Sequence, residues 1–261
     1  MIWLRGGGVL VGLLVGVTSL SAQAFDHQHA GWTRLLERHV EVDGGVGSVD
    51  YDGLAAERPA LERYLAALSS VTPDEFAAFS ADERLAFLIN AYNAFTVQLV
   101  LDHQPIDSIK DIGGWFRSPW KRRFFELLGG ERHLDDVEHG MIRPWFQEPR
   151  IHFAVNCAAV SCPPLQPEAY VADRLDTQLE RATRRFLRDA RRTRFDGSRG
   201  RLELSAVMDW YRDDFERDGD TLGAFVAARI AGGADEGRAI AEAHIRFLDY
   251  DWDLNGRRSP R

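Results

Sequence analysis

The sequence lacks the features of a nucleic-acid-binding, membrane-spanning or zinc-binding chain. Lys and Arg number 32 against 40 Asp and Glu, and the net charge of −8 argues against a polyanionic partner such as nucleic acid. The apolar run from Val9 to Leu20 is interrupted by glycines and falls short of the ~18 to 20 residues that span a bilayer. Only two cysteines occur, and no second Cys/His pair accompanies them, which disfavours a closed tetrahedral zinc site.

The N-terminal segment 1–24 has the pattern of a cleaved secretory signal peptide. Arg5 gives it a positive start, an apolar stretch follows, and Ala22-Gln23-Ala24 fits an A-x-A cleavage motif. No cysteine lies at the cleavage point, so a lipoprotein anchor is not expected. We therefore predict a periplasmic or secreted protein with no stable membrane anchor after signal cleavage and no nucleic acid as a partner.

The rest of the chain, 25–261, is predicted to form one globular domain of the α+β class, with a mainly antiparallel sheet packed against several helices. Helices and strands mix without regular βαβ repetition, which favours this class. Capping boxes at Thr72 to Glu75 and Ser80 to Glu83 predict two helix starts. Further predicted elements are a hairpin turning at Gly129-Gly130, a helix over 135–146, a strand over 150–156, a hairpin over 193–205, a helix over 206–215 and a strand over 244–250.

Two predicted helices carry polar side chains that need an explanation. In the helix that starts at Ser80, Asn90 and Asn93 lie on a mostly apolar segment, so each amide either ties a loop to the helix or lines a polar pocket. In the segment 175–186, Leu175, Leu179, Ala182 and Phe186 form an apolar stripe. The arginines of that segment fall on the other face, which predicts a solvated surface, with an anion-binding patch as the alternative.

The stretch "RIHFAVNCAAVSCPPL" holds both cysteines and allows three kinds of site. Outside the cytosol, Cys157 and Cys162 are first a candidate disulfide, which would stabilise such a short loop by only ~2 kcal/mol. Alternatively Cys157 is a nucleophile that requires a nearby base. Zinc bound by the two cysteines with His152 or His139 is a third, minor possibility.

The candidate bases for a nucleophilic Cys157 are His139, His152 and His244. In a regular strand His152 would lie about 16 Å from Cys157 and point to the opposite face, so it could act only if the chain turned sharply at Asn156. His139 lies on a different element and is the preferred base. Glu138 could orient an imidazole, although its place three residues after Asp135 also suits a structural capping box.

Four separate segments resemble, in order, the domain-of-unknown-function family 547: "FLINAYNAFTVQLVLDH", "LDDVEHGMIRPWF", "EPRIHFAVNCAAVSCPPL" and "FLDYDWDLN". The resemblance covers about 80–255 and implies a domain found in bacterial exported proteins and, in plants, behind a leucine-zipper segment. It implies no established activity. It does imply that the residues falling in these motifs belong to one assembly: Asn90, Tyr92, Asn93, Glu138, His139, His152, Asn156, Cys157, Cys162 and Pro163.

Two functions compete for this assembly. In the first, an exported thiol hydrolase or acyltransferase uses Cys157 as nucleophile and His139 as base, without a cofactor or metal. Its other candidate residues are His152, Asn156 and Glu138 in the catalytic group and Asn90, Tyr92 and Asn93 in substrate binding. In the second, a non-catalytic binding or scaffold domain has a Cys157–Cys162 disulfide, and segments around Trp115, Trp120 and Trp252 present a surface. The predicted partner is a small molecule or a peptide.

Overall fold

The structure is a computed structural model that describes residues 24–43, 46–113 and 118–257. The predicted signal segment up to Gln23 and the side chain of Trp115 lie outside these residues. Within the described chain, helices predominate and the strands form three small sheets. The predicted α+β class is confirmed, although the strands are spread over these small sheets and do not form one large layer.

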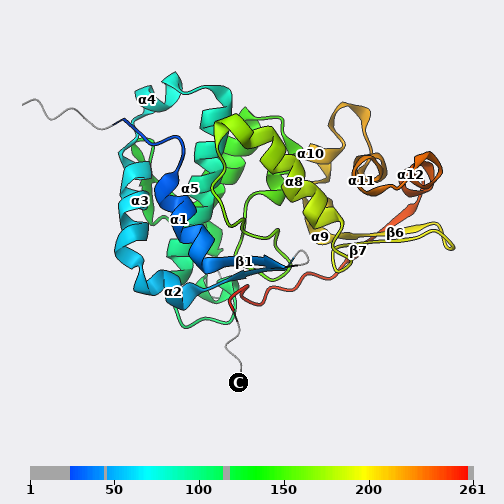
Figure 1. The fold of residues 1–261 in the computed structure, drawn as a ribbon, viewed down its shortest axis with the longest axis horizontal. Coiled ribbons are helices and arrows are strands. Elements are labelled where there is room, and N and C mark those ends of the chain that lie inside the picture. Colours follow the sequence, from blue (N-terminus) through cyan, green and yellow to red (C-terminus); the bar gives the residue numbers. More distant parts are fainter. Residues whose placement is uncertain (1–23, 44–45, 114–117, 258–261) are drawn as a thin grey trace, which may run out of the picture.

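A long apolar helix, α5 (Ala81–Leu101), runs through the larger part of the molecule (Figure 1). It is long and apolar enough to cross a membrane, which is true of no other described helix, but 83% of its apolar stretch is buried inside the fold. It therefore serves as the core helix of this part. The other helices here are α1 (Ala30–His39), α2 (Tyr51–Ala56), α3 (Arg58–Ser70), α4 (Pro73–Ala78) and α6 (Leu134–Val137).

Both predicted capping boxes are confirmed at the starts of α4 and α5. The Thr72 hydroxyl accepts from the Glu75 N–H, and the Glu75 carboxylate accepts from the Thr72 N–H. Ser80 and Glu83 make the same reciprocal pair at α5. These bonds satisfy N–H groups that a helix start leaves without partners, so the start of α5 is determined locally.

Two of the three small sheets are hairpins in the larger part of the molecule. One pairs β1 (Val40–Asp43) with β2 (Val46–Val49), and the other pairs β3 (Phe125–Leu127) with β4 (Gly130–Arg132). The second hairpin is the one predicted from Gly129-Gly130, where Gly129 adopts the left-handed conformation with φ of 72°. That conformation favours glycine and explains the turn.

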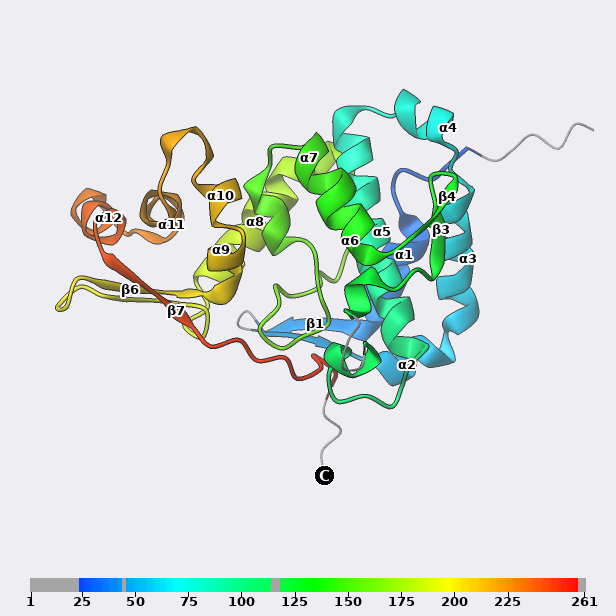
Figure 2. The ribbon, with the colours of Figure 1, turned by 180° about the vertical axis from the view of Figure 1, so that it is seen from behind.

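The smaller part of the molecule contains a three-stranded sheet with helices beside it. Strand β6 (Arg201–Ser205) pairs antiparallel with β5 (Thr193–Asp196), as predicted, and parallel with β7 (His244–Leu248). The parallel pairing requires a crossover, which the intervening helices provide (Figure 2). These helices are α9 (Ala206–Trp210), α10 (Arg212–Phe215), α11 (Leu222–Ile230) and α12 (Ala234–Ala241).

Helix α8 (Leu175–Leu187) joins the two parts into one domain. Its first turns place Leu175 and Leu179 in the apolar core around α5, and its later turns place Ala182 and Phe186 in the core of the smaller part. The predicted apolar stripe is thus confirmed. On the opposite face, arginines pair with neighbouring carboxylates, for example Arg181 with Glu168 and Arg184 with Glu180, as in the solvated-surface interpretation.

The predicted strand over 150–156 is wrong. The chain instead forms a 3-10 helix, Pro149–Phe153, followed by an irregular segment that leads to the cysteines. Within this single turn Ile151 packs into the α5 core and Phe153 into the smaller core. The alternating apolar pattern therefore reflects contact with two cores on opposite sides, and no other strand pairs with this segment among the described residues.

The described C-terminal segment 249–257 returns from β7 along the larger part of the molecule (Figure 2). It bonds to the loop that carries the cysteines, because Val160 N–H donates to the Asp253 carbonyl and Asn255 N–H donates to the Ala158 carbonyl. The segment also pairs Gly256 with Val49 of β2. The C-terminal segment thereby connects the cysteine loop with β2.

Candidate functional site

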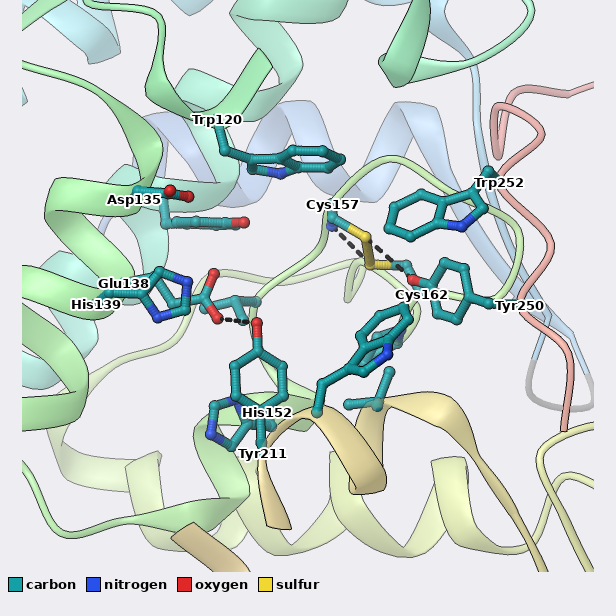
Figure 3. A pocket seen from close by; sticks show the side chains of 15 residues that line it. Trp120, Asp135, Glu138, His139, His152, Cys157, Cys162, Tyr211, Tyr250 and Trp252 are labelled. Carbon is teal, nitrogen blue, oxygen red and sulfur yellow. Dashed lines mark hydrogen bonds between the residues drawn. A yellow bond between two sulfur atoms is a disulfide. The ribbon is translucent and has the colours of Figure 1, made fainter. Parts of the chain in front are cut away.

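A cavity of about 210 Å³ lies where segments distant in the sequence meet (Figure 3). Residues from α6 and the turn after it form one side, and the cysteine loop with segment 249–257 forms the other. Helix α9 and the residue after it complete the wall. The lining residues are Tyr92, Trp120, Asp135, Glu138, His139, His152, Val155, Cys157, Cys162, Pro163, Val207, Trp210, Tyr211, Tyr250 and Trp252.

Glu138 is the most buried acidic group of the cavity, only 5% exposed. It begins a π-helical turn, Glu138–Ile142, in which the Arg143 N–H donates to the Glu138 carbonyl; α7 (Arg143–Trp145) then continues the helix. Pro144 has no N–H to give to a regular helix, and π-helical turns of this kind occur frequently at functional sites. The Tyr211 hydroxyl donates to Glu138 Oε1 at 2.6 Å.

The capping interpretation of Glu138 is wrong. The cap of α6 is His133, whose Nδ1 accepts from the Asp136 N–H, while the Asp136 carboxylate accepts from the His133 N–H. The carboxylate of Glu138 instead faces the cavity (Figure 3). His133 and Asp136 form the capping box of α6, so the carboxylate of Glu138 is not used for capping.

Two tyrosine hydroxyls near Glu138 stay protonated at neutral pH. Burial raises the pKa of Tyr211 and of Tyr92, and the negative charge of Glu138 raises both further. Each phenol therefore remains a hydrogen-bond donor. Asp135 lies one helical turn before Glu138, and burial raises the pKa of its carboxyl as well.

His152 supports the cavity from behind Tyr211. Its ring stacks on the Tyr211 ring with 3.7 Å between centroids, and its Nε2 donates to Asp214 Oδ2 at 2.7 Å. Burial lowers the pKa of His152. Burial acts to raise the pKa of Asp214, but hydrogen bonds from His152 and Arg143 outweigh it and hold that pKa well below its usual range. This arrangement positions Tyr211, which in turn holds Glu138.

His139 lies at the rim of the cavity and is exposed. Arg143 Nη1 donates to its Nδ1 at 3.1 Å, which leaves the proton of the neutral ring on Nε2. The predicted base and the predicted nucleophile Cys157 therefore line the same cavity, on opposite sides of it in Figure 3.

The two cysteines lie at disulfide distance, as the disulfide alternative predicted. Their Cα atoms are 6.0 Å apart, within the range that a disulfide bridges. Cys157 N–H donates to Cys162 Sγ, and Cys157 Sγ lies 3.2 Å from the Tyr250 hydroxyl. The bonded pair forms part of the cavity wall.

The buried asparagines tie loops to α5. Asn93 Oδ1 accepts from the Asn156 N–H and Asn93 Nδ2 donates to the Ala154 carbonyl, while Asn90 bonds to both the carbonyl and the N–H of Tyr170. Asn156 in turn bonds within the cysteine loop, donating to the Pro163 carbonyl. The structure thus uses these three amides to hold the backbone, and of the predicted substrate-binding residues only Tyr92 lines the cavity.

The aromatic side of the cavity was predicted only in part: the binding alternative named Trp120 and Trp252 as surface aromatics, but not Trp210 or Tyr250. Trp210, Tyr250 and Trp252 cluster there, with centroids 4.7 Å apart for Trp210 and Tyr250 and 4.4 Å for Tyr250 and Trp252, and Trp120 lies 5.7 Å from Trp252. Sequence reasoning also missed Asp135, Tyr211 and Asp214. Tyr250 and Trp252 fall in the last family motif, "FLDYDWDLN", and Asp135 falls in the second, "LDDVEHGMIRPWF", so those motifs gave a signal that was not used.

The described residues contain no group of three or more His, Cys, Asp or Glu side chains placed to hold a metal ion. The minor zinc interpretation therefore has no ligand set in this part of the chain. Both sulfur atoms of that interpretation are bonded to each other.

Residues 76–187 match the sequence model of a family described as "Protein of unknown function, DUF547". The match includes α5, the Glu138 helix and the cysteine loop, and it supports the family resemblance drawn from the motifs. No curated protein matches the chain, and no solved structure matches it either.

Proposed function

We propose that the protein is an exported binding domain whose cavity takes a small molecule or a peptide side chain, with the Cys157–Cys162 disulfide as part of the wall. One observation carries this proposal: the nearly buried carboxylate of Glu138 faces a cavity whose other side is aromatic (Figure 3). A buried charge lowers stability unless it is compensated, so its retention here favours a functional use. Aromatic surface with a few converging polar groups is typical of small-molecule sites.

The binding test compares two Trp→Ala variants over a broad ligand panel. Trp252→Ala opens the aromatic side of the cavity, whereas Trp145→Ala removes a tryptophan that is 52% exposed on α7 and does not line it. Thermal unfolding is followed with sugars, amines, carboxylates and dipeptides at millimolar concentration. We expect at least one class to raise the midpoint of wild type and Trp145→Ala but not of Trp252→Ala. A panel without effect, or an effect that survives Trp252→Ala, would falsify the proposal.

Export is part of the proposal, because a disulfide persists in oxidising compartments. The signal pattern up to Ala24 and the close approach of Cys157 and Cys162 support it. Expression of the full sequence in a bacterium should yield a protein that begins at Phe25 by mass spectrometry. Thiol titration after unfolding should find no free thiol without reductant and two after reduction. An uncleaved chain with two free thiols would contradict export.

A second candidate is the thiol hydrolase or acyltransferase, favoured by the presence of Cys157 and His139 in one cavity. An external dithiol must first supply two electrons and two protons, which leaves thiols on Cys157 and Cys162 and a disulfide on the reductant. Cys157 would then pass its proton to Nδ1 of His139, after the Arg143 guanidinium has withdrawn from that nitrogen, and attack an ester or thioester carbonyl. His139 would protonate the departing alcohol or thiol, and water would hydrolyse the acyl-cysteine.

The cysteine variants separate this candidate from the binding domain. Cys162→Ser leaves a free thiol at Cys157, whereas Cys157→Ser removes the nucleophile. Hydrolysis of a chromogenic ester by reduced and desalted protein should occur with wild type and Cys162→Ser, stop with Cys157→Ser and decrease with His139→Ala. Equal rates for the two serine variants would eliminate the thiol enzyme and leave the binding domain in place.

A further inference from the structure

We infer that the ligand of the cavity is an organic cation, an alkylammonium group that sits between the carboxylates of Asp135 and Glu138 and the aromatic side formed by Trp120, Trp210, Tyr250 and Trp252. This inference rests on the proposed function, because it assigns a chemical class to the ligand of that same cavity.

The charge of the cavity wall favours a cation. Asp135 and Glu138 are its carboxylates, and no Lys or Arg lines it. Neither carboxylate has an ion-pair partner among the described residues. Arg143, whose guanidinium lies over the Tyr211 ring, pairs with Asp214 at 2.6 Å from its Nε, and Arg192 Nη1 lies 2.7 Å from Asp189. Lys121 and His139 add positive field at Asp135 without pairing with it. Arg143 likewise adds positive field at Glu138 without pairing with it, so a cation in the cavity would supply the direct ion pair that neither carboxylate makes.

The aromatic side of the cavity also favours a cation. Aromatic faces attract cations through the negative potential above the ring, most strongly for Trp. Trp252 already shows this behaviour, because the Lys110 ammonium lies 3.7 Å from its ring centroid. The nearly parallel Trp210 and Trp252 rings, 19° apart, add stacking surface beside Tyr250. An alkyl chain attached to the cation would find apolar contact here.

The Glu138 carboxylate is preorganised to accept a donor, and the cavity is small. The Tyr211 hydroxyl holds Glu138 in one orientation, and His152 holds the Tyr211 ring, so the carboxylate needs little rearrangement to receive a donor. A cavity of about 210 Å³ is smaller than the ~300 to 1,000 Å³ typical of sites for drug-sized molecules. It suits a small alkylammonium ion or the charged head of a longer ligand.

The test uses three probes of nearly equal size that differ in charge: n-butylammonium, 1-butanol and butyrate. Binding to the full mature chain is followed by tryptophan fluorescence and calorimetry at constant ionic strength. We expect saturable binding of n-butylammonium and at least tenfold weaker binding of the alcohol and the carboxylate. Glu138→Gln keeps the shape of the side chain and should weaken binding of the cation about tenfold or more.

The matched control is Glu131→Gln, which removes an equal charge from an exposed position on β4 outside the cavity and should leave affinity unchanged. If Glu138→Gln does not fold, as judged by circular dichroism, Asp135→Asn takes its place and should also weaken binding. Equal or tighter binding of butanol or butyrate overturns the inference, as does unchanged affinity in the variant. Binding of a neutral or anionic ligand that is lost in Trp252→Ala would overturn the assignment of a cationic ligand but would leave the proposed binding function intact. Failure of every panel compound overturns both.

Discussion

At the scale of single residues, the fold buries several ionisable side chains and uses them to hold one another. Glu138 accepts from Tyr211, Tyr211 stacks on His152, and His152 donates to Asp214. Each link makes the next one more rigid, so the carboxylate in the cavity has a fixed position. The same network explains why a substitution of His152, which is fully buried behind Tyr211, would act on the site indirectly.

A second buried histidine, His29, predicts a loss of stability in acid. Its Nδ1 lies 2.7 Å from the Tyr64 hydroxyl, and burial lowers its pKa to about 4 although Asp26 acts in the opposite direction. Between pH 6.5 and 4 the unfolded chain therefore binds a proton that the folded chain does not. The contribution of the neutral His29 ring to the free energy of unfolding is therefore full above pH 6.5. It decreases by about 3 kcal/mol as the pH falls to 4.

His29→Asn isolates this effect, because asparagine does not titrate and tolerates the left-handed backbone at this position, where φ is 47°. Denaturant unfolding followed by circular dichroism gives the stability of both proteins at each pH. The advantage of wild type over the variant should shrink by about 3 kcal/mol from pH 7 to pH 4. A constant advantage would show that His29 does not couple folding to protons.

At the scale of elements, the contact between α5 and the cysteine loop decides where the loop lies. The sequence predicted α5 and both of its asparagines, and it left open whether they tie a loop or line a pocket. In the structure both side-chain amides form hydrogen bonds with backbone groups of distant segments, 61 to 80 residues away along the chain. No pattern within α5 itself could select between the two roles, because the partners lie outside it.

Asn93→Ala is expected to lower the free energy of unfolding by about 2 to 4 kcal/mol. It leaves two buried backbone groups, the Asn156 N–H and the Ala154 carbonyl, without partners, and each unpaired group costs about 1 to 3 kcal/mol. Urea unfolding of the variant measures the change. Gln147→Ala, at an exposed position, serves as the control and should change stability by less than about 0.5 kcal/mol. A loss below about 1 kcal/mol for Asn93→Ala would contradict this account of the loop.

At the scale of the whole molecule, the fold has two apolar cores, and the elements between them contribute side chains to both. Helix α8 contributes to both, and the 3-10 helix Pro149–Phe153 places Ile151 in one and Phe153 in the other. The cavity lies near this junction, since His152 and Cys157 belong to the same segment. Stability of the junction and integrity of the site should therefore be linked.

Phe153→Ala tests whether the two cores unfold together. Phe153 is fully buried and packs against Phe186 and Phe215, so its loss should cost about 3 to 5 kcal/mol. Because α8 spans both cores, we expect the whole domain to unfold in one transition at a lower denaturant concentration. Circular dichroism and tryptophan fluorescence should give the same midpoint. Two separated transitions would mean that the cores unfold independently.

Features that depend on near neighbours along the chain were predictable from the sequence alone. These are the capping boxes before α4 and α5, the hairpins at Gly129 and over 193–205, the stripe of α8 and the α+β class, and the pairing of the two cysteines was among its stated alternatives. Caps, turns and stripes involve side chains a few residues apart, so a local pattern is enough to predict them.

Three features depended on how the whole chain packs: the turn that replaces the strand predicted over 150–156, the role of Glu138, and the meeting of Trp210 and Tyr250 with Trp120 and Trp252 at one side of the cavity. Seven alternating residues fit a strand as well as one turn between two cores, and only the positions of the cores distinguish them. Glu138 becomes a site residue because Tyr211, 73 residues away, donates to it, and Tyr250 approaches Cys157 across 93 residues. Contacts of that separation depend on how the whole chain packs, and no local pattern contains them.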